Sequence, residues 1–279
     1  AQSFDYNEAT EKWKKPSHIW KLKTHIVNMA MMLKSEAVSH ELLNEEYTDN
    51  AEKLRTILDK YNGTAFEGFT GDEVLSGLDP TRGTELCAIV EQMYSYEELF
   101  AHTGDNKWAE RLEMLAFNAL PATISEDMWT HQYVQQVNQI ACQKTMIMAP
   151  WSTNGPEANN FGLEPNFGCC TANFNQGWPK LALATFMHNG NTIINSVMLP
   201  SVLKDNGITI RLETNYPFEN KMHYHIDADK DFNFIIRVPS FAKALKVNGE
   251  SAEVKDLDFE IKQGKTDIEI EFNATPYLK

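Results

Sequence analysis

Two adjacent cysteines, Cys169 and Cys170, have a spacing that points to chemistry. Consecutive Cα atoms lie about 3.8 Å apart across a trans peptide, below the usual lower limit of about 4.4 Å for the Cα atoms of a disulfide. A bridge between them would therefore be strained. Neighbouring thiols in a glycine-preceded turn are typical soft metal ligands, and zinc is the usual ion. The alternative is that they are two small buried hydrophobic residues.

A second pair of ligand types, Glu85 and Cys87, lies just before a predicted long helix. In extended backbone, residues two apart share a face, so both side chains could bind one ion. Extended backbone that runs into a helix N-terminus also places the Cys87 thiol near the positive end of the helix dipole, which favours the thiolate. If the two pairs meet, three sulfurs and one carboxylate form a complete tetrahedral zinc set with a formal charge of about −2.

The loop GFTGDEVLSGLDPTRG, immediately before this second pair, carries Asp72, Glu73 and Asp79. A carboxyl group beside a metal–thiolate centre could act as a general acid and base. Two other interpretations stay open. A closed four-ligand zinc site is ordinarily structural, and carboxylates in a Gly-rich loop are common turn residues.

Helical periodicity dominates the part of the chain that carries these residues. It predicts helices over roughly residues 18–36, 40–61, 88–102, 107–120 and 174–188. The second ends at Asn62-Gly63, and Thr103-Gly104-Asp105-Asn106 separates the third from the fourth with a C-terminal glycine and a new N-cap.

Beyond Asn189 the pattern changes to short apolar or alternating runs with turn residues about every ten positions, which is typical of an antiparallel β-sandwich. The sequence therefore predicts an α + β multidomain chain, with a helical region over residues 1–188 and a β-sandwich over residues 189–279. His223 and His225 alternate along one predicted strand, and we interpret them as structural.

Composition excludes several classes of partner. With 39 acidic and 25 basic residues, the net charge of −14 disfavours binding to nucleic acid or to an anionic membrane surface. No apolar run approaches the roughly 18 residues of a spanning helix, and the first residues, AQSFDYNEAT, contain no apolar leader. The compartment, whether periplasmic, secreted or cytoplasmic, is left open.

Four segments resemble glycoside hydrolase family 127 and its close relatives, whose founding activity is β-L-arabinofuranosidase. They are TELCA (84–88), FGCCTANFNQGWPKLA (167–182), GDE (71–73) and THIVNMAMMLK (24–34). The resemblance implies a catalytic (α/α)6 helical barrel followed by β-sandwich domains, and a retaining enzyme that uses a cysteine thiolate as nucleophile. Plant cell-wall glycans or oligosaccharides bearing L-arabinofuranose or a related sugar are the implied substrate.

The resemblance also implies a role for each site residue. Zn2+ would be held by Glu85, Cys87, Cys169 and Cys170, with Cys169 as the nucleophile. Glu73 is similar in position to the acid/base, and His25 and Tyr133 to residues that contact the sugar. A buried helix histidine and a core tyrosine are the alternatives for the last two.

The chain departs from the family in length, because relatives are roughly twice as long. We expect it to correspond to the C-terminal half of the catalytic barrel plus one sandwich domain, completed by a partner segment or by a homo-oligomer. A non-catalytic carbohydrate-binding or assembly protein with a structural zinc is the alternative function. A hydrolase using metal-bound water is a third, although it would need an open coordination position.

Other residues carry lesser expectations. Cys142, in the apolar run IACQKTMIM, is predicted to be an ordinary buried thiol, and Trp178 to pack in the core beside Leu181. Trp129 and Trp151 could stack on sugar rings.

Overall fold

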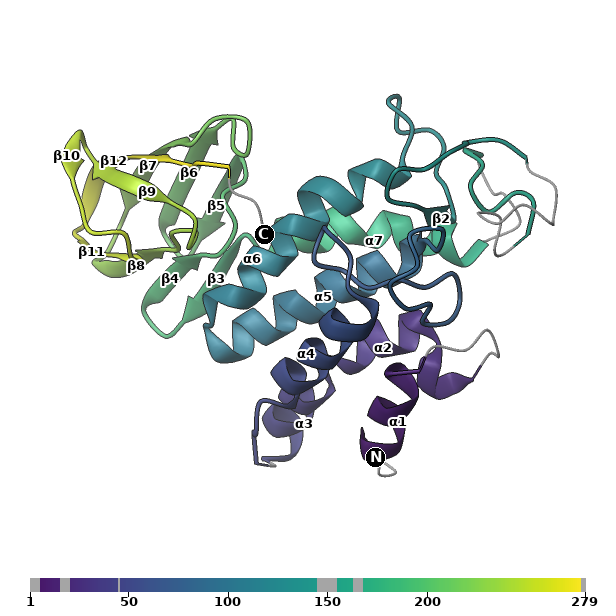
Figure 1. The fold of residues 1–279 in the computed structure, drawn as a ribbon. Coiled ribbons are helices and arrows are strands. Elements are labelled where there is room, and N and C mark those ends of the chain that lie inside the picture. The colour runs from purple at the N-terminus through teal and green to yellow at the C-terminus, as the bar shows by residue number, and fades with distance from the viewer. Residues whose placement is uncertain (1–5, 16–20, 45, 145–154, 163–167, 277–279) are drawn as a thin grey trace. The chain divides into compact units, whose positions relative to one another are not determined.

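The computed structural model describes residues 6–15, 21–44, 46–144, 155–162 and 168–276. The chain divides into two compact units, Ala1–Pro179 and Lys180–Lys279, which are described separately (Figure 1). Together they form a mixed helical and sheet protein, as the residue patterns predicted. None of the helices in the described part of the chain has the length and apolar character needed to cross a bilayer.

The first unit is built from helices and short turns around one central helix, α5 (Leu86–Thr103), against which α2 and α6 pack. Twelve residues of α5 are buried, Ile89, Met93 and Tyr96 among them. The other elements of this part are α1 (Tyr6–Trp13), a 3-10 turn (Leu22–Thr24), α2 (Ile26–Met32), α3 (Ser35–Leu43), α4 (Asn50–Asn62), α6 (Asn106–Met114), a π turn (Leu115–Ala119) and a second 3-10 turn (Pro121–Thr123). Helix α7 (Gly168–Ala184) begins in this unit and continues past its last residue, Pro179.

The predicted caps between α5 and α6 are confirmed. Gly104 adopts a left-handed conformation with φ 65°, and its N–H donates to the carbonyl of Phe100 at 2.8 Å. Asp105 then caps α6 by accepting from the N–H of Lys107 at 3.1 Å. This turn sets α6 back along α5, so that the rings of Tyr96 and Trp108 stack with centroids 5.7 Å apart.

Several predicted helices have different bounds in the structure. In its described part, the helix predicted over residues 18–36 is the 3-10 turn Leu22–Thr24 followed by α2, and α3 begins at Ser35. The helix predicted over residues 40–61 is two helices, because Asn44 after α3 has φ 54° and ends the first one. The helix predicted to reach residue 188 ends at Ala184. There the carbonyl of Thr185 accepts from the backbone N–H of Ser196 at 3.0 Å and from the Asn195 side chain at 2.9 Å, so the chain is drawn into a sheet.

A short two-stranded sheet positions the residues before α5. β1 (Thr84–Glu85) pairs antiparallel with β2 (Val134–Gln135), so that Glu85 stands opposite Val134. The approach is close at Gly83, where an added Cβ would lie 2.1 Å from Val134 Cγ1 and 2.5 Å from the carbonyl oxygen of Gln135. Glycine is therefore required at this position for the two strands to meet.

The second unit consists of two sheets. The six-stranded sheet has the order β10-β9-β12-β7-β6-β5, and the four-stranded sheet has the order β11-β8-β4-β3. Their strands are β3 (Phe186–Asn189), β4 (Thr192–Asn195), β5 (Ser201–Asp205), β6 (Ile208–Thr214), β7 (Lys221–Ala228), β8 (Phe232–Ile236), β9 (Lys243–Val247), β10 (Glu250–Ser251), β11 (Leu257–Ile261) and β12 (Gly264–Asn273).

One pairing differs from the antiparallel prediction, because β4 and β8 run parallel. The chain between them makes β5, β6 and β7 of the other sheet and then returns in the same direction. Side chains link the two sheets at this point. The ring of Tyr224 on β7 lies 5.5 Å from that of Phe234 on β8, and its hydroxyl donates to Asn195 Oδ1 on β4 at 2.7 Å.

Candidate metal centre

Glu73 lies in the loop between α4 and β1 and has a left-handed backbone with φ 92°, which is unusual for a residue other than glycine. Its carbonyl accepts from the N–H of Ile26 at 2.9 Å, at the start of α2. The neighbouring Asp72 is fully buried and pairs with Arg82, while Ser76 donates to its Oδ1 at 3.2 Å. These contacts hold the loop in a strained conformation, and strain of this kind is concentrated at functional sites.

The buried Asp72 carboxyl has an environment that opposes its charge. Burial raises the pKa of Asp72, although the Arg82 guanidinium acts in the opposite direction. The ion pair therefore fixes the turn next to Glu73 in a place where loss of either partner would leave an isolated buried charge.

The Glu73 carboxylate contacts both of the predicted sugar-binding residues. The hydroxyl of Tyr133 donates to Oε1 at 2.7 Å, and His25 Nε2 lies 3.2 Å from Oε2. Tyr133 is buried, whereas the Glu73 side chain is 38% exposed. Glu73 is thus oriented by a buried partner and still reaches solvent, as a residue that transfers protons to a bound substrate must.

Glu85 is the last extended residue before α5, with φ −68° and ψ 137°. Its N–H donates to the carbonyl of Gly71 at 2.9 Å, and the next N–H, of Leu86, donates to the carbonyl of Tyr133 at 2.9 Å. Glu85 is 2% exposed, and its Oε2 has no hydrogen-bond partner among the described residues. A buried carboxylate oxygen without a partner is costly unless a cation binds it.

The structure brings all four predicted metal ligands together. Glu85, Cys87, Cys169 and Cys170 each offer an atom within 4.8 Å of the others, and the sulfurs of Cys87 and Cys170 are 3.2 Å apart. In a tetrahedral zinc centre with Zn–S bonds of about 2.3 Å, two sulfurs stand about 3.8 Å apart. The four cysteines that the structure describes are all free thiols. The donor set and its spacing therefore fit a zinc ion.

The backbone around Cys87 differs from the extended conformation predicted for it. Helix α5 begins at Leu86, so Cys87 lies in the first turn, and Cys169 and Cys170 lie in the first turn of α7. The expected thiolate at Cys87 is not favoured. Its hydrogen bond with Cys170 lowers the pKa of Cys87, yet burial and the adjacent Glu85 carboxylate outweigh that effect and raise it.

The electrostatics of the cluster oppose full ionisation of its ligands unless a cation is bound. Burial, followed by the charges of Glu73 and Cys169, raises the pKa of Glu85 to about 8. Hydrogen bonds with Cys169 and Cys87, together with burial, raise the pKa of Cys170. Four acidic groups so close together cannot all ionise without a positive charge between them, and a bound divalent cation reverses this balance.

Cys169 differs from its two cysteine neighbours because it is exposed. The hydrogen bond from the Cys170 thiol, with a further one from Cys87, lowers the pKa of Cys169 to about 6 despite partial burial. An exposed sulfur with thiolate character is the member of the cluster that can attack a bound molecule.

A smaller group, His25, Glu73 and Glu85, also has its ligand atoms within 4.8 Å of one another. Glu85 therefore faces both the thiol cluster and the Glu73 carboxylate. The candidate acid/base and the candidate ligand set form one continuous site.

His131 is a site residue that sequence reasoning did not identify. It is 5% exposed, and its Nε2 lies 2.9 Å from the hydroxyl of Thr171, the residue that follows Cys170. This bond ties the first turn of α7 to the segment before β2. The position of His131 two residues before Tyr133 was the available signal, but the contact spans 40 positions in the sequence.

The remaining expectations have mixed outcomes. Cys142 is exposed, not buried, and accepts from the side chain of Gln139 at 3.0 Å; it sits in a polar turn, and the apolar residues after position 144 lie outside the described ranges. Trp178 is partly buried and packs edge-to-face on Phe174, with centroids 6.1 Å apart. Trp129 is 71% exposed, and Trp151 lies outside the described residues.

Two family models match this sequence. The family model for the β-L-arabinofuranosidase GH127 catalytic domain matches residues 39–183, and that for the GH127 middle domain matches residues 194–268. The chain belongs to glycoside hydrolase family 127, as the resemblance predicted. No curated protein matches it.

Solved structures agree with this fold. One described as a glycoside hydrolase has a TM-score of 0.73 at 16% identity, over 90% of this chain and 47% of its own. A GH127 β-arabinofuranosidase designated BT3674 has a TM-score of 0.67 at 18% identity, over 96% and 46%. A GH127 β-L-arabinofuranosidase from Geobacillus stearothermophilus T6 has a TM-score of 0.63 at 14% identity, over 95% and 44%. The chain spans about half the length of these structures.

Proposed function

We propose that this chain carries the zinc centre and the catalytic pair of a retaining glycoside hydrolase that releases β-linked L-arabinofuranose or a related sugar. The observation that supports this most is the juxtaposition of an exposed, low-pKa thiol with a partly exposed carboxylate. Cys169 belongs to the Cys/Glu cluster, and Glu73 faces that cluster through Glu85 and is held by Tyr133 and His25. Membership of family 127 is consistent with this reaction.

The proposed reaction is a double displacement. In the first step, the Cys169 sulfur attacks the anomeric carbon, the bond to the leaving oxygen breaks, and Glu73 gives its proton to that oxygen. In the second step, Glu73 takes a proton from water, the water oxygen attacks the anomeric carbon, and the carbon–sulfur bond breaks to return the Cys169 thiolate. Two inversions give net retention.

Zinc, held by Glu85, Cys87, Cys169 and Cys170, would keep the sulfurs deprotonated at neutral pH. The protein's own residues do the rest. Tyr133 donates to Glu73 Oε1 and His25 borders Oε2, so the carboxyl is oriented on both oxygens. These two residues are also our candidates for contact with the sugar, because both border the carboxylate that must reach the leaving oxygen.

The proposed architecture follows the same family. Residues 1–188 would form part of an (α/α)6 barrel, and residues 189–279 a β-sandwich made from the two sheets. A partner segment or a second copy of the chain would complete the barrel, and plant-derived oligosaccharides would be the substrate. The links between the sheets at Tyr224, Phe234 and Asn195 support the sandwich.

The test is to measure zinc content and to trap the protein with a cysteine-directed epoxide of L-arabinofuranose configuration, followed by peptide mapping. We expect one zinc ion at the Cys/Glu cluster and an adduct on Cys169. Cys142→Ser is the matched control, because Cys142 is exposed but lies outside the cluster. An adduct on Cys142 alone, or hydrolysis that continues with no adduct, would exclude the thiolate mechanism.

Two substitutions separate the roles of the carboxylates. Glu73→Gln should retain zinc while turnover of substrates with poor leaving groups falls at least about a hundredfold, because the proton donor is lost. Glu85→Gln should weaken zinc binding. A structural zinc in a non-catalytic protein would instead show metal loss in Glu85→Gln and no turnover in any form.

A further inference from the structure

A second cluster of metal-binding side chains lies in the other unit, on the outer face of the six-stranded sheet. His223 and His225 are both on β7, where burial alternates strictly: Met222, Tyr224 and Ile226 are buried, and the two histidines between them are not. Residues two apart on a strand share a face. The imidazole centroids are 4.2 Å apart. The strand that we interpreted as carrying structural histidines thus presents both rings outward.

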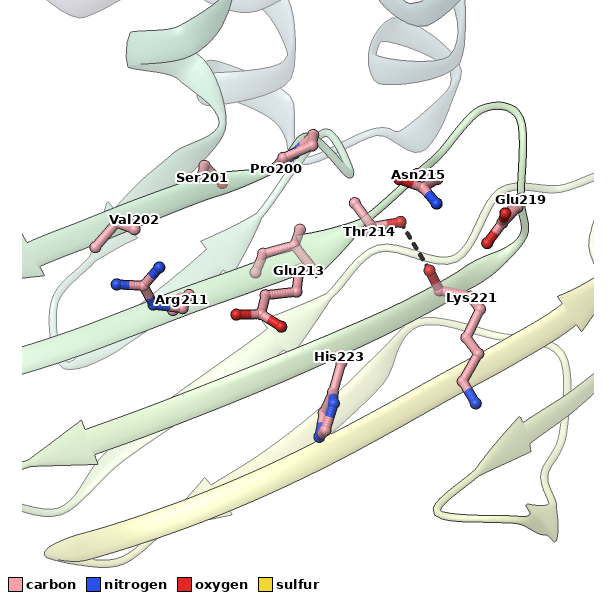
Figure 2. A pocket seen from close by; sticks show the side chains of 11 residues that line it. Pro200, Ser201, Val202, Arg211, Glu213, Thr214, Asn215, Glu219, Lys221 and His223 are labelled. Carbon is pink, nitrogen blue, oxygen red and sulfur yellow. Dashed lines mark hydrogen bonds between the residues drawn. The ribbon is translucent and has the colours of Figure 1, made fainter.

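Carboxylates stand on both sides of this histidine pair. On β12, Asp267 is opposite His225, and its Oδ1 is 2.5 Å from His225 Nδ1. On β6, Glu213 is opposite His223, and its Oε2 is 3.7 Å from His225 Nε2. Glu213 and His223 line a groove of about 650 Å³ on this face, and Figure 2 shows their side chains on neighbouring strands. Three adjacent strands therefore each contribute a ligand type.

From this arrangement we propose a second metal site, formed by His223, His225 and Asp267 with Glu213 as a fourth ligand, for a first-row divalent transition ion such as Zn2+. One ligand atom from each of His223, His225 and Asp267 lies within 4.8 Å of the others. Around one ion with Zn–N and Zn–O bonds of about 2.0–2.2 Å, ligand atoms stand about 3.4 Å apart in a tetrahedron. The three side chains must turn to close this difference. Glu213, which borders His225 Nε2 whereas Asp267 meets Nδ1, must turn further to join them.

The strand positions make the site stiff. β7 is an interior strand with β6 and β12 paired on either side, so the backbone of the two histidines is held by hydrogen bonds in both directions. The residues that alternate with them are buried. Because the Cβ positions are fixed by the sheet, an ion costs the protein little ordering beyond the rotamers of four side chains. Bound, it would link β6, β7 and β12.

Ligand chemistry selects the ion. Two imidazoles and two carboxylates suit Zn2+, Cu2+ and Ni2+. The thiol-rich cluster of the first unit instead suits ions that prefer soft sulfur ligands. Two carboxylates balance the charge of a divalent ion. Nearby, Lys221 pairs with Glu269 at 2.9 Å and so is already compensated. Arg211, the cross-strand neighbour of His225, and Lys265, which borders the same surface, are positive charges that oppose binding.

The experiment is a calorimetric titration of the intact chain with ZnCl2, after one equivalent of zinc has filled the thiol cluster. We expect a second equivalent to bind. His223→Ala and His225→Ala should each weaken it at least about tenfold, since even partners outside the direct ligand set cost tenfold to a hundredfold in metal affinity. Arg211→Ala should tighten it.

His188→Ala is the matched control. His188 is also a half-exposed histidine of the second unit, with its Nε2 3.0 Å from Asp205 Oδ2, but it is not part of the cluster. Its substitution should leave the second equivalent unchanged. The proposal is overturned if the preloaded chain binds no second equivalent, or if binding persists at unchanged affinity in the His223→Ala/His225→Ala double variant.

Cobalt substitution distinguishes the two sites without any variant. Thiolate-bound Co2+ has an intense near-ultraviolet charge-transfer band, which Co2+ bound to imidazole and carboxylate lacks. The second equivalent should add visible bands and leave the charge-transfer band unchanged. Growth of that band with the second equivalent would place it on the thiols and overturn the proposal.

Discussion

The two ligand clusters differ mainly in their exposure to water. In the first unit, Glu85 and Cys170 are 2% and 0% exposed. In the second, the side chains of His225 and Asp267 are 40% and 67% exposed. Water can solvate the second cluster when no ion is bound, whereas in the first cluster only Cys169 is exposed and the other three ligands are buried. If the proposed ions bind, burial would make the cation part of the folded state at the first cluster, whereas the second cluster could stay folded without one.

Metal removal should produce the largest difference between the two units. Stripping zinc from the thiol cluster should destabilise the first unit by about 5 kcal/mol or more, because structural zinc contributes directly to folding. This corresponds to a fall in Tm of at least about 10 °C for a unit of this size. Differential scanning calorimetry with and without a chelator measures it. The transition of the second unit should move by less than about 3 °C, and equal shifts of the two would contradict the contrast.

The ion pairs of the two units should show the same contrast between buried and exposed groups, with smaller changes in the free energy of unfolding. Arg82→Met leaves the fully buried Asp72 carboxylate without its guanidinium and should cost about 3 kcal/mol in the free energy of unfolding. The exposed pair of Lys221 and Glu269 is the control, and Lys221→Ala should produce no measurable change. Urea titration of both variants gives the comparison. A loss in Lys221→Ala as large as that in Arg82→Met would show that burial is not the deciding factor.

The pH dependence of Cys169 alkylation should show whether this thiol is ionised in the zinc-free first cluster. Because the pKa of Cys169 is lowered to about 6, its thiolate is present above that pH and is lost as the pH falls through it. Alkylation of the zinc-free chain by iodoacetamide should therefore be half-maximal near pH 6, and zinc should protect the residue. Mass spectrometry of the Cys169 peptide follows the rate at each pH. A half-point above pH 8 would mean that Cys170 and Cys87 do not stabilise the thiolate.

Salt should produce the smallest effect and should act on one cluster only. Raising ionic strength from about 50 mM to about 500 mM shortens the Debye length from about 14 Å to about 4 Å and screens exposed charges. We expect zinc affinity at the histidine cluster to change by no more than about threefold, and affinity at the thiol cluster to stay constant. Competition with a chelating dye at both salt concentrations tests this. A larger response at the thiol cluster would indicate that its charges are less shielded from solvent than the burial of Glu85, Cys87 and Cys170 implies.

The chemistry of the thiol cluster was legible in the sequence because it depends on side-chain type and local spacing, whereas His223 and His225 were interpreted as structural. Adjacent Cys169 and Cys170 cannot form a relaxed disulfide. Glu85 and Cys87, two residues apart at a helix start, are metal-ligand residue types at a spacing that the sequence itself sets. The order of helices followed by strands, the caps at Gly104 and Asp105, and family 127 membership were likewise predictable, since each rests on a pattern within a short segment.

The tertiary structure alone decided what these segments meet and what water reaches. Cys87 and Cys170 are 83 positions apart, and only packing brings their sulfurs to 3.2 Å. Packing also placed Glu73 between His25 and Tyr133, exposed Cys142, and raised the pKa of Cys87 in the absence of a metal ion. The same holds for His225 and Asp267, which share a site through strand register. Ligand identity is a property of residues, but distance, burial and hence charge are properties of the folded chain.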